Sequence, residues 1–295
     1  MHGIYITAVI TTAFSAALLG WLGFFRAQHD LRPALLTAFL IVLPLQPLFF
    51  YLIRLPFHEL MKQWFAGNKP LLGFLTTFYA PLTEEPAKLI PLLIPFMRRR
   101  ITRENLASFA VMLGLGFGIG EMWMVAHEIA KAPQFQNLAW YDFMGYLNER
   151  FMVCIFHASF TAFALLFMRK KFWLGFLIAL SLHYTLNFPI YLKALDAFGL
   201  GKTAWDGILA LFLLGTFLGM GTVLGKLAAG GRTIAQMVYG EAKCPDCGKI
   251  YPRPMFRAIN LGLQRYERCP YCGKWHMTTR YKPAPAGQSP DSENQ

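Results

Sequence analysis

Long apolar runs with few charged interruptions make up most of the first 230 positions of the chain. Seven of these runs are long enough to cross the hydrocarbon core of a bilayer, which takes about 20 residues in a helix. They span residues 4–25, 34–53, 71–97, 105–129, 151–168, 172–194 and 206–229. The pattern predicts an all-α membrane protein whose polytopic bundle has about seven transmembrane helices.

The third run departs from this pattern because it carries charge near its middle. The string Glu84-Glu85-Pro86-Ala87-Lys88 puts two carboxylates and one ammonium group where the hydrocarbon would be. A charged side chain at the centre of a spanning helix costs roughly 2.5–3.5 kcal/mol on insertion scales. Such a cost predicts a functional site, and the alternative is a buried ion pair that locks the packing of the helices.

More ionisable and amide groups lie in the three runs that follow. Glu121 comes directly after a glycine-rich stretch over 114–120, which lets a neighbouring helix approach closely and is expected to place Glu121 against the third run. His157 lies in the fifth run, and His183 and Asn187 share one face of the sixth. The rise of ~1.5 Å per residue places these groups between the midplane and the outer leaflet. We therefore expect one site that opens outward.

The chemistry of this set has two readings that the sequence leaves open. Carboxylates, imidazoles and an amide can activate water and stabilise a tetrahedral oxyanion. Glutamate and histidine side chains can equally hold a zinc ion in the membrane site. This ion, which would be separate from the one predicted below for the C-terminal cysteines, lowers the pKa of the water bound to it. The His-Glu-x-x-His string of helical zinc proteases is absent from the sequence.

In order and spacing, four motifs across roughly residues 70–190 resemble those of the PrsW-type intramembrane proteases. These proteases are distant relatives of the type II CAAX prenyl endopeptidases and of bacterial CAAX-protease-like membrane proteins. The resemblance implies a peptidase of the bacterial cytoplasmic membrane that cuts a membrane-anchored protein, such as an anti-sigma factor, on its extracytoplasmic side. The motifs are Glu84-Glu85-Pro86-Ala87-Lys88, Phe117-Gly118-Ile119-Gly120-Glu121, Arg150 with His157, and His183-x-x-x-Asn187.

The resemblance also implies a role for each residue that matches a motif. The first glutamate of the third run is the base that activates water, with the second glutamate close by. The glutamate of the fourth run and the histidine of the fifth complete the water or metal site, and the last histidine and asparagine serve the oxyanion. The predicted catalytic residues are Glu84, Glu85, Glu121, His157, His183 and Asn187.

A different pattern begins after the last apolar run, where one six-residue motif occurs twice. Cys244-Pro245-Asp246-Cys247-Gly248-Lys249 and Cys269-Pro270-Tyr271-Cys272-Gly273-Lys274 have 21 residues between their inner cysteines. Paired motifs of this kind supply four thiolates for tetrahedral zinc, whereas two disulfides would need an oxidising compartment. We predict a structural zinc ion held by Cys244, Cys247, Cys269 and Cys272 in a zinc ribbon that cannot fold on its apolar core alone.

Composition indicates that the protein lies in a membrane, and the distribution of charge indicates on which side each terminus lies. Hydrophobic residues make up 55% of the chain, charged residues 15%, and the mean hydropathy is +0.38, which excludes an ordinary soluble domain for most of it. The net charge of +12 reflects topology, not nucleic-acid binding, because Arg98–Arg103 and Arg169–Lys171 are dense clusters on one side. By the positive-inside rule that side, with the C-terminus, is cytoplasmic, and the N-terminus lies outside.

The predicted organisation has three parts: a transmembrane peptidase-like domain over 1–230, a zinc ribbon over 240–282 and a disordered tail over 283–295. Within the ribbon, strands are expected at 250–251 and 255–259. The segment 54–70 is either a short amphipathic helix on the outer surface or a loop.

Two other functions are consistent with the sequence. One is a non-catalytic membrane scaffold or sensor whose zinc ribbon recruits an unknown cytoplasmic partner. The other is a proton-coupled transporter that uses the buried carboxylates as a relay, although the inverted repeats expected of a transporter are not apparent. In each case the lipid bilayer is a partner.

Overall fold

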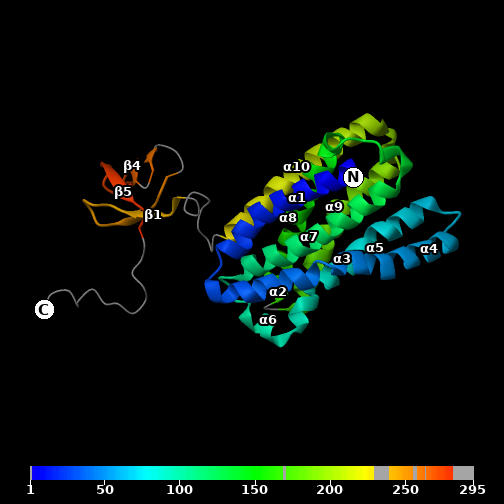
Figure 1. Ribbon diagram of the computed structural model, residues 1–295, viewed down its shortest axis with the longest axis horizontal. Helices are drawn as coiled ribbons and strands as arrows, with labels where there is room; N and C mark the ends of the chain where they lie inside the picture. Colours follow the sequence, from blue (N-terminus) through cyan, green and yellow to red (C-terminus); the bar gives the residue numbers. More distant parts are fainter. Residues whose placement is uncertain (1, 169–170, 229–238, 255–257, 263, 282–295) are drawn as a thin grey trace. The chain divides into compact units, whose positions relative to one another are not determined.

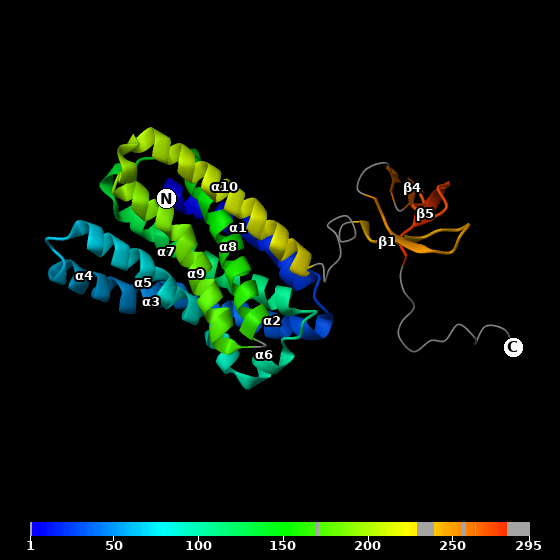
Figure 2. The ribbon, with the colours of Figure 1, turned by 180° about the vertical axis from the view of Figure 1, so that it is seen from behind.

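A computed structural model describes residues 2–168, 171–228, 239–254, 258–262 and 264–281, and these divide into two compact units, over 1–228 and 229–295 (Figures 1 and 2). The tail predicted over 283–295 lies outside the described residues, as do positions 255–257 of one predicted strand.

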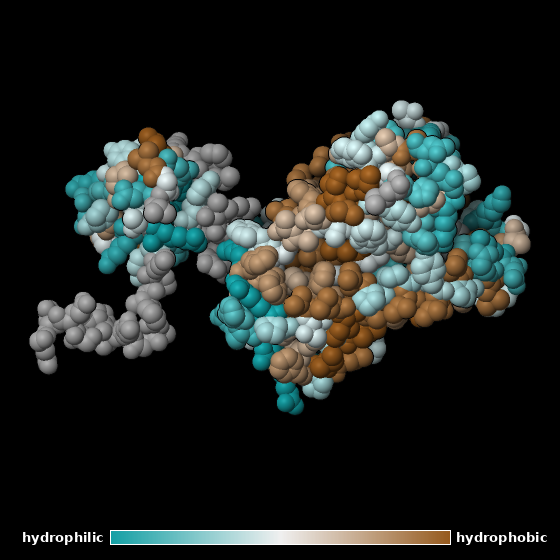
Figure 3. Space-filling view, viewed as in Figure 1, coloured by the Kyte–Doolittle hydropathy of each residue, from teal (hydrophilic) through white to brown (hydrophobic). Residues whose placement is uncertain are grey.

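The first unit is entirely helical. Six of its helical stretches are long and apolar enough to cross a membrane: Gly3–Phe25, His29–Trp64, Leu106–Lys131, Trp140–Met168, Phe172–Ala194 and Gly201–Ala228. Figure 3 shows apolar side chains in a broad band across this unit, with hydrophilic side chains at its ends. The predicted membrane-spanning bundle is thus confirmed. Its α-helices are α1 (Gly3–Gly20), α2 (Arg32–Val42), α3 (Leu45–Phe49), α4 (Leu55–Trp64), α5 (Lys69–Leu89), α6 (Pro95–Arg100), α7 (Leu106–Lys131), α8 (Met144–Met168), α9 (Phe172–Ala194) and α10 (Gly201–Ala228).

Helix α5 is shorter than the run predicted for it over 71–97. It ends at Leu89, a 3-10 turn follows over Ile90–Leu93, and α6 begins at Pro95. Pro91 and Pro95 lack the backbone N–H that a continuing helix needs, and each disfavours helical geometry at the residue before it. Because α5 also carries charge, it is not among the six apolar stretches.

The second span extends further than predicted. Helices α2, α3 and α4 follow one another with a π-helical turn, Phe50–Arg54, between α3 and α4. The helical stretch therefore runs on to Trp64 instead of ending at residue 53. Of the two alternatives for segment 54–70, a helix is thus found over Leu55–Trp64, and α4 and α5 follow one another as a hairpin (Figure 1). Helix α5 packs along α9, where Tyr191 donates to the carbonyl oxygen of Pro70 at 3.1 Å.

Helix α7 lies at the centre of the bundle, since 83% of its most apolar window is buried. Its glycines allow the close approach that their spacing predicts. A Cβ atom on Gly114 would lie 2.2 Å from the backbone nitrogen of Ala158 in α8, and one on Gly120 would lie 2.2 Å from the carbonyl oxygen of Leu43. Glu121 lines the same cavity as Glu84 of the third run, and its hydrogen bonds run to Arg150 and His157 of α8.

The second unit consists of short antiparallel strands (Figure 1). Two strands form one sheet and three form a meander in the order β3-β4-β5. Each cysteine motif connects two paired strands, β1 to β2 and β4 to β5. The small strand-containing unit predicted after the bundle is therefore present. Its strands are β1 (Glu241–Lys243), β2 (Ile250–Pro252), β3 (Ala258–Leu261), β4 (Gln264–Arg268) and β5 (Trp275–Thr279).

Candidate active site

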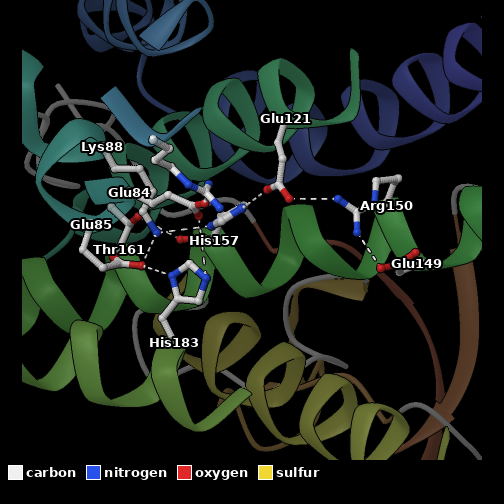
Figure 4. Close-up of polar contacts among 10 residues, drawn as sticks. Glu84, Glu85, Lys88, Glu121, Glu149, Arg150, His157, Thr161 and His183 are labelled. Carbon is white, nitrogen blue, oxygen red and sulfur yellow. Dashed lines mark hydrogen bonds and ion pairs between the residues drawn. The ribbon is translucent and has the colours of Figure 1, made fainter. Parts of the chain in front are cut away.

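Four consecutive long helices of the first unit bring their polar side chains together in one network (Figure 4). Helix α5 contributes three ionisable groups, α7 one, α8 three and α9 one. The residues that these four helices contribute are up to 99 positions apart in the sequence, and Arg54 joins them through Glu84. The residues on the four helices are Glu84, Glu85, Lys88, Glu121, Glu149, Arg150, His157 and His183.

Lys88 and Glu85 form the buried centre of the network. Lys88 is 0% exposed, and its Nζ lies 2.7 Å from Glu85 Oε1 and 3.2 Å from His157 Nδ1. Glu85 Oε1 also accepts a hydrogen bond from His183 Nδ1 at 2.6 Å. A buried charge is tolerated when it is paired and hydrogen-bonded, and both charges meet that condition. Glu85 therefore joins α5 to α9 through its hydrogen bond with His183.

Glu84 has a different environment from its neighbour. Its Oε1 accepts a hydrogen bond from Arg54, and its Oε2 lies 3.7 Å from His183 Nε2. The side chain lines a cavity of about 580 Å³, whereas Glu85 does not. Adjacent residues of a helix point about 100° apart, so the two carboxylates approach His183 from different sides, one at each ring nitrogen. Glu84 is the member of the pair that can meet a ligand.

His157 is held from both sides of its ring. Its Nε2 lies 2.7 Å from Glu121 Oε2, and Glu121 Oε1 accepts a hydrogen bond from Arg150 Nη1 at 2.9 Å. An ammonium group can only donate, so Nδ1 of His157 accepts from Lys88 and Nε2 donates to Glu121. This assigns the neutral Nε2–H tautomer. Glu121 therefore orients His157 and is itself held by Arg150.

The cavity lies among α5, α7, α8 and α9, with the π-helical turn and α10 on its wall. Asn187 lines it one helical turn after His183, and its side chain has no hydrogen-bond partner within the described part of the chain. The amide is therefore free to bind a ligand. Five of the six predicted catalytic residues line the cavity, and the sixth, Glu85, lies behind them. The five are Glu84, Glu121, His157, His183 and Asn187.

Two charged residues of the site, Arg54 and Glu149, lie outside the four motifs of the sequence. Arg54 belongs to the segment 54–70, which the sequence predicts as a surface helix or a loop, whereas it pairs with Glu84. Lys88 of the first motif pairs with Glu85. The i,i+3 spacing of Lys88 and Glu85 was a local signal for that pair. Nothing in the sequence near Arg54 identifies its partner, because Glu84 lies 30 positions away.

The set Glu84, His157 and His183 fits a metal ion by its donor chemistry. Each residue offers one ligand atom, and these atoms all lie within 4.8 Å of one another. One carboxylate and two imidazoles are a common ligand set of catalytic zinc. Both nitrogens of His157 have partners here, so a metal ion on Nδ1 would take the position of the Lys88 ammonium group.

The four cysteines of the second unit form a separate cluster. Cys244 Sγ lies 3.6 Å from Cys272 Sγ, and Cys247 Sγ lies 3.8 Å from Cys269 Sγ. Tetrahedral zinc with Zn–S bonds of about 2.3 Å places its sulfur ligands ~3.8 Å apart, whereas a disulfide bond is about 2.05 Å long. All four thiols are free, and together they can hold a metal ion.

The two cysteine motifs also repeat each other in three dimensions. Cys244 N–H donates to Lys249 O at 3.0 Å, and Cys269 N–H donates to Lys274 O at 2.9 Å. In each motif the glycine N–H also donates to the carbonyl oxygen of the first cysteine, at 3.0 Å in both cases. The repeat in the sequence therefore encodes two equivalent turns, each of which presents two sulfur atoms.

A bundle of apolar helices that encloses glutamate, histidine and asparagine side chains around a cavity defines a membrane-embedded hydrolase site. Residues 31–220 match the model of the PrsW family, described as intramembrane metalloproteases. The chain belongs to this family of intramembrane proteases and is an integral membrane protein, which confirms the family predicted from the four motifs. Neither the curated proteins nor the solved structures that were compared show a match to the chain.

Proposed function

We propose that the protein hydrolyses a peptide bond of a membrane-anchored substrate in this cavity, with Glu84 as the residue that activates water. The observation that carries the proposal is the different placement of the two adjacent glutamates. Glu84 lines the cavity, whereas Glu85 is held by Lys88 and His183. A general base must reach the proton that it abstracts, and Glu84 alone of the pair meets that condition.

Arg54 controls the access of water to Glu84. Its guanidinium group donates to the carboxylate that is to act as the base. While that contact lasts, one carboxylate oxygen of Glu84 is occupied by Arg54. We infer that a bound substrate displaces Arg54, after which Glu84 takes a proton from water as the oxygen attacks the scissile carbonyl carbon.

Asn187 supplies the donor for the oxyanion that forms in this step. Its amide faces the cavity and has no hydrogen-bond partner among the described residues. His183 already donates its Nδ1–H to Glu85, so it can donate to an oxyanion through Nε2 only as an imidazolium. The proton that Glu84 collects can protonate this nitrogen or the leaving amine. Donors of this kind contribute roughly 2.7–4 kcal/mol each in known enzymes.

Metal assistance uses the same residues. Glu84, His157 and His183 would hold the ion, for which we propose zinc. When bound, such an ion polarises the carbonyl group and lowers the pKa of its water. Glu121 would then keep the His157 ring in place through the hydrogen bond to Nε2. For the cluster of four cysteines we propose a structural zinc ion, because four protein ligands leave no open position.

We propose the bacterial cytoplasmic membrane as the location, with the N-terminus outside and the C-terminus in the cytoplasm. Arg100 donates to the carbonyl oxygen of Asp30, which ties two basic turns to one end of the bundle. By the positive-inside rule that end is cytoplasmic. The cavity reaches Phe135 and Glu149, beside the loop that joins the outer ends of α7 and α8. A single-span protein such as an anti-sigma factor would be cut on its extracytoplasmic side.

The test compares Glu84→Gln with Glu85→Gln in cells that co-express a single-span reporter. We expect Glu84→Gln to lower cleavage by about 10²-fold or more, because it removes the general base. Glu59→Gln is the matched control, since Glu59 pairs with Lys62 on the surface of α4. Membrane fractionation shows that each variant still inserts. Cleavage by Glu84→Gln at the wild-type rate would refute the role of Glu84 and favour a non-catalytic scaffold.

A further inference from the structure

The three-stranded sheet of the second unit has its polar and apolar faces reversed. Along β4 and β5 the buried positions are polar or charged, and the exposed positions between them include aromatic and aliphatic side chains. Ile259, Tyr266 and Met277 lie opposite one another in register, so they form one row across the sheet. A sheet with one solvated face normally shows the opposite alternation.

The exposed row belongs to a larger apolar face, which we define as Ile259, Leu261, Tyr266, Trp275 and Met277. The fraction of each residue that is exposed runs from 38% for Tyr266 to 58% for Ile259. The rings of Tyr266 and Trp275 stack with centroids 5.3 Å apart. No residue in the described part of the second unit covers this face.

The buried face cannot exchange places with the exposed one. Glu267 is 0% exposed, accepts a hydrogen bond from Thr278 at 2.7 Å and lies 3.4 Å from the Nε atom of Arg253. Tyr251 also donates to Glu267, and burial together with this carboxylate raises the pKa of Tyr251. Tyr251 packs with Cys244 and Cys269 in the buried cluster of the unit, so turning the sheet over would break the hydrogen bonds that Tyr251 and Thr278 donate to Glu267. The apolar face is therefore a fixed feature of the unit.

The chain itself indicates what covers this face. Only residues 229–240 separate the last candidate span, which ends at Ala228, from β1. Twelve residues reach at most about 40 Å when fully extended, so the unit stays within that distance of a membrane. Tryptophan and tyrosine with aliphatic neighbours are the side chains that settle at the interface between lipid and water.

The net charge of the second unit indicates which lipid headgroups it would bind. Between residues 239 and 281 the sequence has eight lysines and arginines against three aspartates and glutamates. Arg268 pairs in register with Trp275, which puts a guanidinium group at the edge of the apolar face. We propose that the apolar face docks on the surface of an anionic lipid bilayer, with its aromatic and aliphatic side chains at the depth of the headgroups. Basic residues beside an apolar face favour anionic over zwitterionic lipid.

The test uses the full-length protein at one copy per lipid nanodisc, with bromine on the acyl chains near the headgroups. The emission of Trp275 is obtained as the difference between wild type and Trp275→Phe. We expect it to be largely quenched in discs that contain phosphatidylglycerol and less so in discs of phosphatidylcholine alone. Equal emission without quenching in both discs would overturn the proposal. Protection of Trp275 only in discs with two copies, or only after addition of single-stranded DNA, would overturn it in favour of those partners.

Two substitutions, one inside and one outside the apolar face, test whether this face is the part of the unit that contacts lipid. Met277→Glu puts a charge into the centre of the row and should release Trp275 from the lipid. Ile250→Glu is the control, because Ile250 is an exposed aliphatic residue of β2 outside the apolar face. One metal ion per cysteine cluster shows that each variant is folded. Equal quenching of Trp275 in both variants would contradict the proposal that the apolar face contacts lipid. If a variant fails to fold, the comparison of the two lipids with the wild-type protein still tests the proposal.

Discussion

At the scale of single residues, the adjacent glutamates Glu84 and Glu85 have different surroundings and different roles. Glu84 and Glu85 are adjacent and both buried, yet only Glu84 lines the cavity. Lys88 joins the second glutamate to His157 at the centre of the site. The cost of placing charge in a membrane helix is thus offset within the network, and one carboxylate is left for chemistry. The ion pair and the functional site, posed as alternatives by the sequence, are both present in α5.

Lys88→Met tests the structural half of this arrangement. The change leaves Glu85 buried without its cation, and losing one partner of a buried pair typically costs about 3–5 kcal/mol. We expect a lower thermal midpoint in detergent and loss of activity. Because Glu85→Gln removes the unpaired charge, the double variant should recover much of the lost stability. A double variant as unstable as Lys88→Met alone would show that the pair does not act as a unit.

Asn187→Ala tests the proposed oxyanion donor. Since the amide has no partner among the described residues, its removal should leave the stability almost unchanged. Cleavage should fall by about 10²–10³-fold through kcat, as seen when one oxyanion donor is removed. Thr185→Ala, at an exposed position of the same helix, is the control. A change confined to KM would assign Asn187 to substrate binding instead.

At the scale of elements, the position of α7 determines how the site is assembled. Its glycines bring α8 close enough for Glu121 to reach His157 and Arg150. The π-helical turn before α4 lies where Arg54 enters the cavity, and such turns often occur at functional sites. The contact of Arg54 with Glu84 joins this turn to α5, which carries three ionisable groups of the site. Catalytic geometry therefore depends on how helices approach one another.

Gly114→Ala tests the role of this approach. The added methyl group would lie 2.2 Å from a backbone atom of α8, which cannot move as a side chain can. Overpacking of this kind costs typically about 1–3 kcal/mol, and it should displace His157 and abolish cleavage. Gly215→Ala in α10 is the matched control, because nothing lies within 4 Å of its added Cβ. Equal thermal midpoints for the two variants would contradict the predicted helix contact.

At the scale of the whole molecule, two units with different sources of stability share one chain. The helical unit buries a large apolar core, whereas the buried apolar cluster of the second unit consists of Ala242, Cys244, Tyr251 and Cys269. Two of these four residues belong to the cysteine cluster. We expect a unit with so small a core to depend on the metal ion that its thiols can hold.

Cys269→Ser tests that dependence. The change removes one thiolate from the four, so the full-length protein should lose its bound metal and the region 239–281 should become sensitive to trypsin. The helical unit should keep its thermal midpoint, because none of its core residues belongs to the cysteine cluster. Metal content and the trypsin fragments are measured together. Continued resistance of this region to trypsin without metal would show that the strands fold on their own.

Much of the fold and of the candidate site is local information and was predictable. Apolar runs indicate where helices cross the membrane, and the paired cysteine motifs indicate a four-sulfur cluster. Even the end of α5 had a local cause in Pro91 and Pro95, although the predicted run extended past them. The residues around the cavity were also foreseeable, because a charged or imidazole side chain in a span needs polar neighbours.

The sequence by itself therefore determined which side chains are out of place in a membrane and which four thiols belong together. Only the tertiary structure decided that Glu84 faces the cavity, that Arg54 reaches it and that the sheet in the second unit exposes its apolar side. The physical reason is that these facts depend on the rotation of one helix against another and on strand register. Such long-range packing brings together residues that carry no signal of each other along the chain.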